Sequence, residues 1–544
     1  MSSPATAATT PRPAVGPRFP NPHGALSIPF WLSLTGLASV FSLIRLSLVI
    51  LLPLDRAHGL FDDDAFFYFG VARNIAAGAG STFNGVDLTN GYHPLWMAVL
   101  VPLFAAFSGR SVLVAVVVVS TACFLVSARL LDLLARRSGH PAAATLCALP
   151  LLVAGATGPS FWFSGMETGL LLLGLLTLAW VSARPGGALD PAGSRRAALL
   201  AGVVMAATVL ARLDAVFPLL AVGTLMVVRW RRRPLREVLL LVATVAVVPA
   251  LVLIGYLTAS RRLFGTPLPV SGQAKALGGG PRAADLVQFL QAPVLFGQEL
   301  WLGALAVVVA PLAVLVGRHY SSALPAFGLA VLTGGLLTVV YYSLTSSWRL
   351  WPWYFYAAPL ALALCGPVLA ARIPLTRGWR PLLAAALALA VLMVAGKAAI
   401  VWRGGGEAEF VVRSPEVAAA VTALAPPGTA VAMGDRAGSF GYELGRPLVH
   451  LEGLVGPANY LPALDRGDVG PFLASHRVSV YVRADNDAGT PDPAAGPGCR
   501  RYPEPEQGAG PKAPVIACDP DLLLTVPLDD ASYRVWRYRP ELNS

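Results

Sequence analysis

Residues 238–257 read VLLLVATVAVVPALVLIGYL, twenty consecutive residues without a charged side chain. An α-helix of this length is about 30 Å long at 1.5 Å per residue, which matches the hydrocarbon thickness of a bilayer. About eleven apolar runs recur along the chain, near 26–54, 111–134, 141–157, 168–183, 197–213, 214–229, 238–257, 300–317, 322–344, 353–371 and 381–401. The fold class that they predict is a polytopic α-helical membrane protein.

The composition excludes a cytosolic enzyme. Of the 544 residues, 55% are hydrophobic and 13% are charged, whereas soluble proteins carry about 25% charged residues. The net charge is +11, but 28 basic and 12 acidic residues precede Trp402, against 13 and 18 from Trp402 onward. The positive excess therefore lies between the apolar runs, as in cytoplasmic loops. Basic and aromatic residues do not interleave as in a nucleic-acid groove, so we expect a lipid bilayer and no nucleic acid as partner.

Loop charge predicts the topology. Residues 1–27, rich in Pro, Ala and Thr, predict a disordered cytoplasmic tail. The segment 94–107 is apolar but short, and we interpret it as a juxtamembrane helix rather than a span. All Arg clusters then face the cytoplasm, at 136–137, 184–196, 229–233, Arg318 and 372–380, Arg377 included. This topology places residues 28–401 in a bacterial plasma membrane and residues 402–544 outside it.

Residues 402–544 predict an extracytoplasmic α/β domain. A helix at 415–424 precedes apolar strands near 430–433, 448–451, 478–482 and 533–538. Strands that alternate with helices favour a parallel sheet. Cys499 and Cys518 both lie in this exported part, so a disulfide between them is one of two alternatives, the other being free thiols. The cysteines in the apolar runs are expected to be packing residues.

The first external loop, 55–110, contains two polar motifs. FDDDAF at 61–66 places the carboxylates of Asp62, Asp63 and Asp64 side by side, where mutual repulsion and the nearby membrane oppose their ionisation. They either cap a helix over 65–77 or form a carboxylate base or a cation site. NGYHPLW at 90–96 predicts a turn at Asn90 and a helix after His93. No two of the seven histidines have metal-ligand spacing, so a zinc site is not expected.

Two later motifs place charges between apolar runs. Glu167, in SGMET at 164–168, starts a span, where a carboxylate also interacts favourably with the helix dipole. Arg212 and Asp214, in ARLD at 211–214, must pair or line a wet cavity, because an unpaired charge at membrane depth is costly. A structural ion pair and a functional site both remain open for these two residues.

Two external loops carry cations and aromatic rings. The loop 261–288 holds Arg261, Arg262 and Lys275, and outward cations of this kind suit a phosphate because they donate charge-assisted hydrogen bonds. The loop 346–354 reads SSWRLWPWY and ends in Trp353 and Tyr354. These rings form either an interfacial aromatic belt or a wall on which a sugar or a prenyl chain stacks.

Taken in order, DDAF, NGYHPLW, GMET, ARLD and FGTPLP at 264–269 resemble the GT-C superfamily of membrane glycosyltransferases over residues 28–401. The likeness is strongest to bacterial, particularly actinobacterial, members of unassigned substrate. It is weaker to arabinofuranosyltransferases, protein O-mannosyltransferases and the lipid A aminoarabinose transferase. The resemblance implies a catalytic acid in the first external loop and a polyprenyl-phosphate sugar donor. By motif this acid is Asp63, with Asp64 beside it and Glu167 as the second-loop acid, while Asp62 departs from the family pattern.

The implied reaction is sugar transfer to a cell-envelope glycan, lipid or protein on the outer face of the membrane, with inversion of the sugar. A carboxylate accepts the proton of the acceptor hydroxyl, and cations stabilise the leaving lipid phosphate. A divalent metal, Mg²⁺ or Mn²⁺, held by Asp63 and Glu167 is an alternative source of positive charge. The candidate substrate-binding residues are Asn90, His93, Glu167, Arg212, Asp214, Arg261, Arg262, Lys275, Trp353 and Tyr354. The competing hypotheses are a transporter or flippase of lipid-linked sugars, which would carry midplane charges, and a cell-envelope scaffold.

Overall fold

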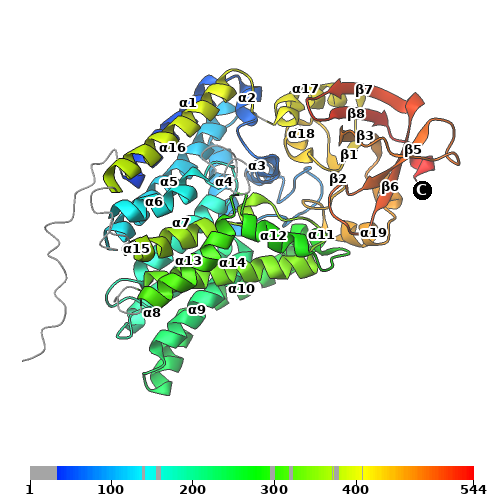
Figure 1. Cartoon of the computed structure of the whole chain (residues 1–544). Coiled ribbons are helices and arrows are strands. Elements are labelled where there is room, and N and C mark those ends of the chain that lie inside the picture. The colour runs from blue at the N-terminus through cyan, green and yellow to red at the C-terminus, as the bar shows by residue number, and fades with distance from the viewer. Residues whose placement is uncertain are drawn as a thin grey trace, which may run out of the picture.

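The computed structural model describes residues 33–137, 141–154, 161–293, 300–317, 323–370, 372, 379–406 and 408–543. A helical body and a C-terminal α/β domain lie side by side, and α3 lies between them (Figure 1). The predicted tail 1–27 falls outside the described residues, as do Arg318 and Arg377. The two parts correspond to the apolar and the less apolar portions of the sequence.

A helix overlaps each of the eleven apolar runs. These helices are α1 (Leu34–Leu51), α5 (Arg110–Arg137), α6 (Pro141–Val153), α7 (Thr168–Ser182), α8 (Arg195–Ala211), α9 (Val216–Trp230), α10 (Leu235–Phe264), α13 (Leu302–Val316), α14 (Leu324–Thr345), α15 (Ala357–Ala370) and α16 (Trp379–Trp402). Within the described ranges, six helical segments are long and apolar enough to cross a membrane. The chain is therefore a polytopic α-helical membrane protein, and the number of its spans stays a prediction.

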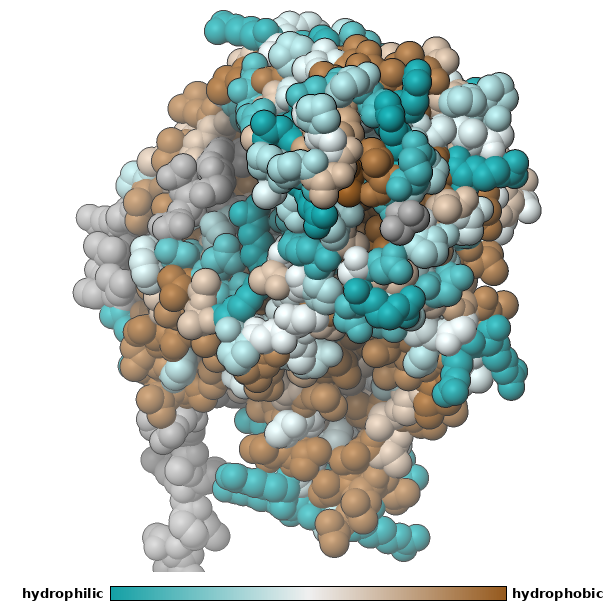
Figure 2. Space-filling model, turned by 90° about the vertical axis from the view of Figure 1, so that its right-hand side faces the viewer, coloured by the Kyte–Doolittle hydropathy of each residue, from teal (hydrophilic) through white to brown (hydrophobic). Residues whose placement is uncertain are grey.

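The long helices pack into one bundle with an apolar outer surface. Helix α10 has 30 residues, about 45 Å at 1.5 Å per residue, and packs on α8, while α14 packs on α9 and α15. On α10 the side chains of Leu251 and Ile254 are 64% and 60% exposed. Apolar side chains also gather on the helices below the α/β domain in the view of Figure 2. Such a surface is suited to lipid rather than to water.

Short helices at one end of the bundle carry the polar motifs. They are α2 (Leu54–His58), α3 (Asp63–Ala76), α4 (Pro94–Ala106), α11 (Val270–Ala276) and α12 (Ala283–Gln291). Asp62 is the extended N-cap residue of α3, and the next two aspartates occupy its first turn, where the helix dipole favours negative charge. The predicted helix 65–77 is confirmed with an earlier start, and α4 is the predicted short helix.

The main sheet of the α/β domain is mixed, with the strand order β2-β1-β3-β8-β7. Its strands are β1 (Ala430–Met433), β2 (Leu448–His450), β3 (Val478–Asp485), β7 (Leu522–Pro527) and β8 (Ser532–Arg537), and the helices are α17 (Glu409–Leu424), α18 (Ala437–Glu443), α19 (Leu461–Asp465) and α20 (Gly470–Ser475). Strand β1 runs parallel to β2 and β3, whereas β8 runs antiparallel to β3 and β7. The prediction of a parallel sheet is wrong for β7 and β8. Helices connect β1 to β2 and β2 to β3, as parallel pairs require, but the chain after β3 returns through a second sheet.

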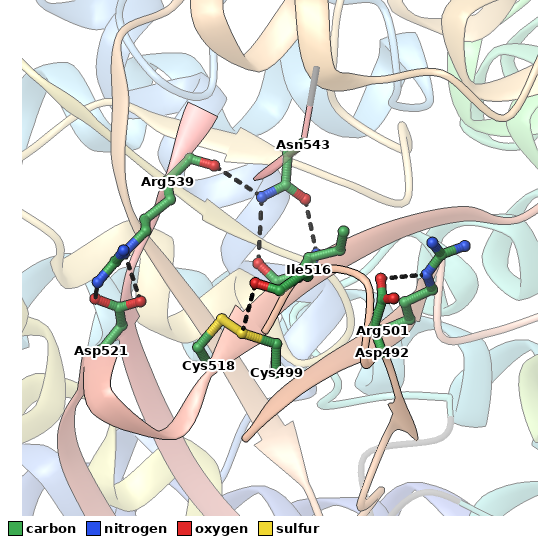
Figure 3. The surroundings of a disulfide bond; sticks show 9 residues. Asp492, Cys499, Arg501, Ile516, Cys518, Asp521, Arg539 and Asn543 are labelled. Carbon is green, nitrogen blue, oxygen red and sulfur yellow. Dashed lines mark hydrogen bonds and ion pairs between the residues drawn. A yellow bond between two sulfur atoms is a disulfide. The ribbon is translucent and has the colours of Figure 1, made fainter. Parts of the chain in front are cut away.

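The second sheet contains a hairpin that the sequence analysis did not predict. It consists of β4 (Thr490–Pro491), β5 (Cys499–Glu504) and β6 (Ala513–Cys518). Cys499 lies opposite Cys518 at the base of the β5–β6 hairpin, and the two are joined by a disulfide (Figure 3). The neighbouring ion pair between Arg501 and Asp492, 2.6 Å, also ties β5 to the β4 segment. Among the described residues, the free cysteines are Cys123, Cys147 and Cys365, all in the helical body.

Candidate functional site

The Asp62–Asp64 triplet lies where the helical body meets the carboxyl ends of the parallel strands. Asp435 follows β1, and His450 and Glu452 lie at the end of β2. Asp435 and His450 are close enough to Asp64 for their charged forms to shift its pKa. The carboxyl edge of parallel strands is the usual position of binding sites in α/β domains. The junction between the two parts of the chain is therefore the candidate site.

The carboxylate of Asp63 accepts hydrogen bonds from the α/β domain. Its Oδ2 accepts the N–H of Gly438 at 2.9 Å, and its Oδ1 accepts the N–H and the hydroxyl of Ser439 at 2.8 and 2.7 Å. Three donors at the start of α18 thus hold the carboxylate. The assignment of Asp63 as a catalytic base stays a prediction, and these three contacts give Asp63 a role in docking the α/β domain as well.

Asp64, the next residue, faces a different set of charges. Burial raises the pKa of Asp64 to about 6, Lys275 opposes this shift, and Asp63 and Asp435 add to it. An aspartate with this pKa is mostly ionised at neutral pH and is a stronger base than an ordinary aspartate. Asp64 is therefore the carboxylate of the triplet that has the properties of a general base.

Lys275 is the cation with the largest effect on the pKa of Asp64. It lies on α11, half-buried, with its Nζ 5.6 Å from the centre of the Trp348 ring. Burial alone would lower the pKa of Lys275, but Tyr354, Asp64 and Glu452 outweigh it and leave the pKa above its ordinary value. Lys275 is therefore a charged ammonium at neutral pH.

Glu167 is the centre of a second polar cluster. It is 4% exposed and accepts a hydrogen bond from the hydroxyl of Tyr68 at 2.8 Å. Its Oε1 lies 3.7 Å from Nε2 of His93 and 4.0 Å from Nε of Arg212. Gly165 allows this approach, because it has a φ of +83° and a Cβ there would lie 2.8 Å from Cβ of Ala65 on α3.

His93 and Arg212 complete this cluster. Burial lowers the pKa of His93, and its Nδ1 accepts the N–H of Leu213 at 3.3 Å, so a neutral ring presents Nε2–H towards Glu167. Arg212 pairs with Asp214, Nε to Oδ1, at 3.0 Å. These contacts join residues from three motifs, NGYHPLW, SGMET and ARLD.

The aromatic loop packs against the same arginine. The guanidinium carbon of Arg212 lies 4.4 Å from the centre of the Tyr354 ring, and its Nη1 donates to the carbonyl of Trp353 at 3.1 Å. The Trp353 ring stacks on Trp351 with centroids 5.7 Å apart. The structure thus brings together Glu167, His93, Arg212, Asp214, Trp353 and Tyr354, with Lys275 beside Tyr354.

Asn90 and the two remaining arginines lie elsewhere. Asn90 donates to Ser260 at 2.8 Å and accepts the N–H of Val270 at 2.9 Å, so it anchors the start of α11. Arg261 and Arg262 are exposed and line an open hollow of about 550 Å³ at the end of α10. Lys275 is instead half-buried near Trp348, so a single phosphate site shared by these arginines and Lys275 stays a prediction.

The two carboxylates suggested as metal ligands do not fit that role. Asp63 already accepts three hydrogen bonds from N–H and O–H donors, and Glu167 accepts from Tyr68 next to the cationic Arg212. A second cation beside Arg212 would be repelled. Over the described ranges, no group of three His, Cys, Asp or Glu side chains is arranged as metal ligands.

Several residues of the site were missed from the sequence. Tyr68 is four residues after Asp64 on the same helix, a spacing that places both on one face. His450 and Glu452 are 4% and 2% exposed and lie at the end of a buried strand. Polar residues at the carboxyl end of a parallel strand often belong to a binding site, so their position in the sequence was a usable signal. Burial lowers the pKa of His450 to about 4 and raises the pKa of Glu452 well above its usual range. The imidazole of His450 is therefore neutral at neutral pH.

No protein-family model and no curated protein matches the sequence. Among solved structures, ArnT from Cupriavidus metallidurans in the apo state matches with a TM-score of 0.51 and 13% identity, over 94% of this chain and 99% of ArnT. The same protein bound to undecaprenyl phosphate gives a TM-score of 0.46 and 15% identity, over 83% and 93% of the two chains. An oligosaccharyltransferase from Archaeoglobus fulgidus gives 0.45 and 11%, over 84% and 69%.

The match to apo ArnT extends over the helical body and the α/β domain together, since it covers nearly all of both chains. At this level of identity the likeness concerns the fold. This fold agrees with the resemblance that the order of the polar motifs indicated. The chain is a membrane protein with the fold of the GT-C superfamily of glycosyltransferases.

Proposed function

We propose that this protein is a glycosyltransferase that moves a sugar from a polyprenyl-phosphate donor to a cell-envelope glycan, lipid or protein on the outer face of the bacterial plasma membrane. The observation that carries this proposal is the electrostatic interaction between Asp64 and Lys275, each of which shifts the pKa of the other at the junction of the two domains. Sugar transfer from a lipid phosphate requires one base and one cation. These two residues supply them.

Asp64 is the general base of this mechanism. The acceptor oxygen attacks the anomeric carbon while a carboxylate oxygen of Asp64 takes the hydroxyl proton. The bond from the anomeric carbon to the phosphate oxygen breaks, and its electron pair stays on that oxygen. Lys275 stabilises the phosphate charge that develops. A single displacement of this kind inverts the configuration of the sugar.

The Glu167 cluster forms the adjoining wall. Glu167 and Asp214 carry two negative charges around Arg212, which they hold in place. His93, Trp353 and Tyr354 contact the same arginine or its partners. Carboxylates, imidazole and aromatic faces are the groups that bind sugar hydroxyls and sugar ring faces, so we assign sugar binding to this wall.

An apolar groove lies between three helices of the body. It has a volume of about 370 Å³ and is lined by residues of α8, α9 and α10, from Val209 and Val216 at one end to Trp230 at the other. Val209 and Val216 flank the Arg212–Asp214 pair in the sequence. We assign this groove to the isoprenoid chain of the donor, because its lining is apolar and two of its lining residues are close in sequence to the Arg212–Asp214 pair.

Purified protein incubated with a panel of radiolabelled polyprenyl-phosphate sugars and envelope acceptors tests the function. We expect transfer of label by the wild type and by Asp55→Asn, which alters an exposed carboxylate of the same loop, and loss of transfer by Asp64→Asn. Transfer from nucleotide sugars but from no polyprenyl-phosphate sugar would disprove the donor class. Wild-type transfer by Asp64→Asn would disprove the assigned base.

A further inference from the structure

The tip of the β5–β6 hairpin, residues 505–512, reaches from the α/β domain to the helical body. The N–H of Ala509 donates to the carbonyl of Ser347 at 2.9 Å, and the N–H of Ser347 donates to the carbonyl of Lys275 at 2.8 Å. The Ser347 hydroxyl also donates to that carbonyl, at 3.1 Å. Two successive hydrogen bonds therefore connect the hairpin tip to the backbone of Lys275.

The tip also lies in close contact with the end of α11. A Cβ on Gly510 would lie 2.3 Å from the carbonyl oxygen of Leu277, two residues after Lys275. A Cβ on Gly508 would lie 2.7 Å from the ring of Trp348, the same ring that Lys275 faces. The tip thus packs directly against Leu277 and Trp348, the two residues near Lys275 in sequence or in space.

The other side of the tip is fastened to the acids around Asp64. Gln507 donates to Oδ2 of Asp435 at 2.7 Å and, through its N–H, to Oε1 of Glu452 at 3.3 Å. Lys512 donates to the carbonyls of Gly508 at 2.9 Å and Gln507 at 3.3 Å, which closes the tip on itself. The disulfide closes the base of the same hairpin. The hairpin is therefore a braced element with fixed contacts on both sides of the Asp64–Lys275 pair.

We propose that the β5–β6 hairpin tip is a positioning element that sets Lys275 against Asp64, through Ser347 and the end of α11. The inference rests on the proposed function of the Asp64–Lys275 pair. Reacting groups held in the productive geometry account for a large part of enzymatic rate, and a misplacement of about 1 Å can cost roughly 100-fold. The α/β domain contributes to the reaction in this way through the position of Lys275.

The position of Lys275 affects the pH at which the rate of transfer falls. Lys275 lowers the pKa of Asp64, so displacement of the ammonium raises that pKa. The rate of transfer requires ionised Asp64 and falls as the pH decreases through this pKa. A misplaced Lys275 therefore moves the acid limb of the pH–rate profile to higher pH, whereas a general loss of folded protein lowers the rate equally at every pH.

Gly510→Ala tests this inference, with Gly280→Ala as the matched control, because a Cβ at Gly280 meets nothing within 4 Å. We expect Gly510→Ala to lower kcat roughly 10- to 100-fold and to shift the acid limb upward, in the direction shown by Lys275→Met. Gly280→Ala should keep the wild-type profile. Lys512→Met, which releases the tip without a new contact, should shift the limb in the same direction.

A wild-type kcat and an unmoved acid limb in folded Gly510→Ala and Lys512→Met, with Lys275→Met slowed, would overturn the positioning role and leave the proposed function intact. A lower rate at every pH without a shift of the limb would also overturn it, in favour of a purely structural role. Wild-type transfer by both Lys275→Met and Asp64→Asn would instead disprove the function on which the inference rests.

Discussion

Oδ1 of Asp63 accepts both the backbone N–H and the side-chain hydroxyl of Ser439, at 2.8 and 2.7 Å. One aspartate at the start of α3 thus fastens the helical body to the α/β domain, and its neighbour Asp64 is left to face Lys275. Adjacent residues in a helix point about 100° apart. Two adjacent carboxylates can therefore serve two different contacts, one structural and one chemical.

Asp63→Ala should loosen the α/β domain. The change removes three hydrogen bonds to a carboxylate, and the loss of a charged partner costs about 1 to 3 kcal/mol, or roughly 5- to 150-fold in the docking equilibrium. Tryptic cleavage after the exposed Arg403, in the connection between the domains, should accelerate accordingly. Asp55→Ala serves as the control at an exposed site. Equal cleavage rates for Asp63→Ala and the wild type would contradict the docking role.

Asp64→Asn should slow sugar transfer about 100- to 10,000-fold, because the amide cannot accept the acceptor proton. In the wild type the ionised carboxylate is the active form, so the rate should fall as the pH decreases through about 6, the pKa of Asp64. A pH–rate profile over pH 5 to 8 measures both effects. A profile that stays flat through pH 6 would exclude Asp64 as the group that titrates.

Lys275→Met should weaken binding of a polyprenyl-phosphate donor analogue by about 1.5 to 3 kcal/mol, or roughly 10- to 100-fold. The double variant of Arg261→Ala and Arg262→Ala should change this affinity much less, because these arginines line a separate surface hollow. Equilibrium binding of a fluorescent lipid phosphate to both proteins compares the two sites. The reverse ranking would place the donor phosphate at the end of α10.

Gly223→Leu should impair use of long-chain donors. Gly223 lines the apolar groove, and a Cβ there meets nothing within 4 Å, so leucine fills the groove without a clash in the protein. Displacement of two methylene groups of the lipid costs about 1.6 kcal/mol, or roughly 15-fold in KM.

Gly255→Leu is the matched control for the groove, because Gly255 is equally open but lies on α10 away from the groove lining. A donor analogue with a short tail should be used equally well by Gly223→Leu and the wild type. If Gly223→Leu and Gly255→Leu have the same KM for the long-chain donor, the isoprenoid chain binds elsewhere.

Single cysteines at Val86, Ala488 and Arg232 should report the orientation. The first two positions are exposed on the first loop and on the α/β domain, and the third lies in the Arg cluster after α9. An impermeant thiol reagent should label Val86→Cys and Ala488→Cys on intact spheroplasts, and Arg232→Cys only after permeabilisation. The opposite pattern would invert the topology and place the candidate site inside the cell.

The sequence by itself determined the helical body and the places where its polar residues lie. Apolar run length and helical periodicity are local properties, and for this reason the runs matched the helices and 430–433 matched β1. The charges at Glu167 and Arg212 were recognisable as partners or cavity residues, because isolated charges between apolar runs need compensation.

Only the tertiary structure decided which of these residues act together. Asp62, Asp63 and Asp64 are three identical residues in a row, so the sequence does not distinguish their roles. Their partners come from α18 and α11, which lie hundreds of residues away in the chain. The antiparallel direction of β8, the contribution of His450 and Glu452, and the separation of Arg261 from Lys275 have the same origin. Each is set by long-range packing, which no local pattern of hydrophobicity or charge encodes.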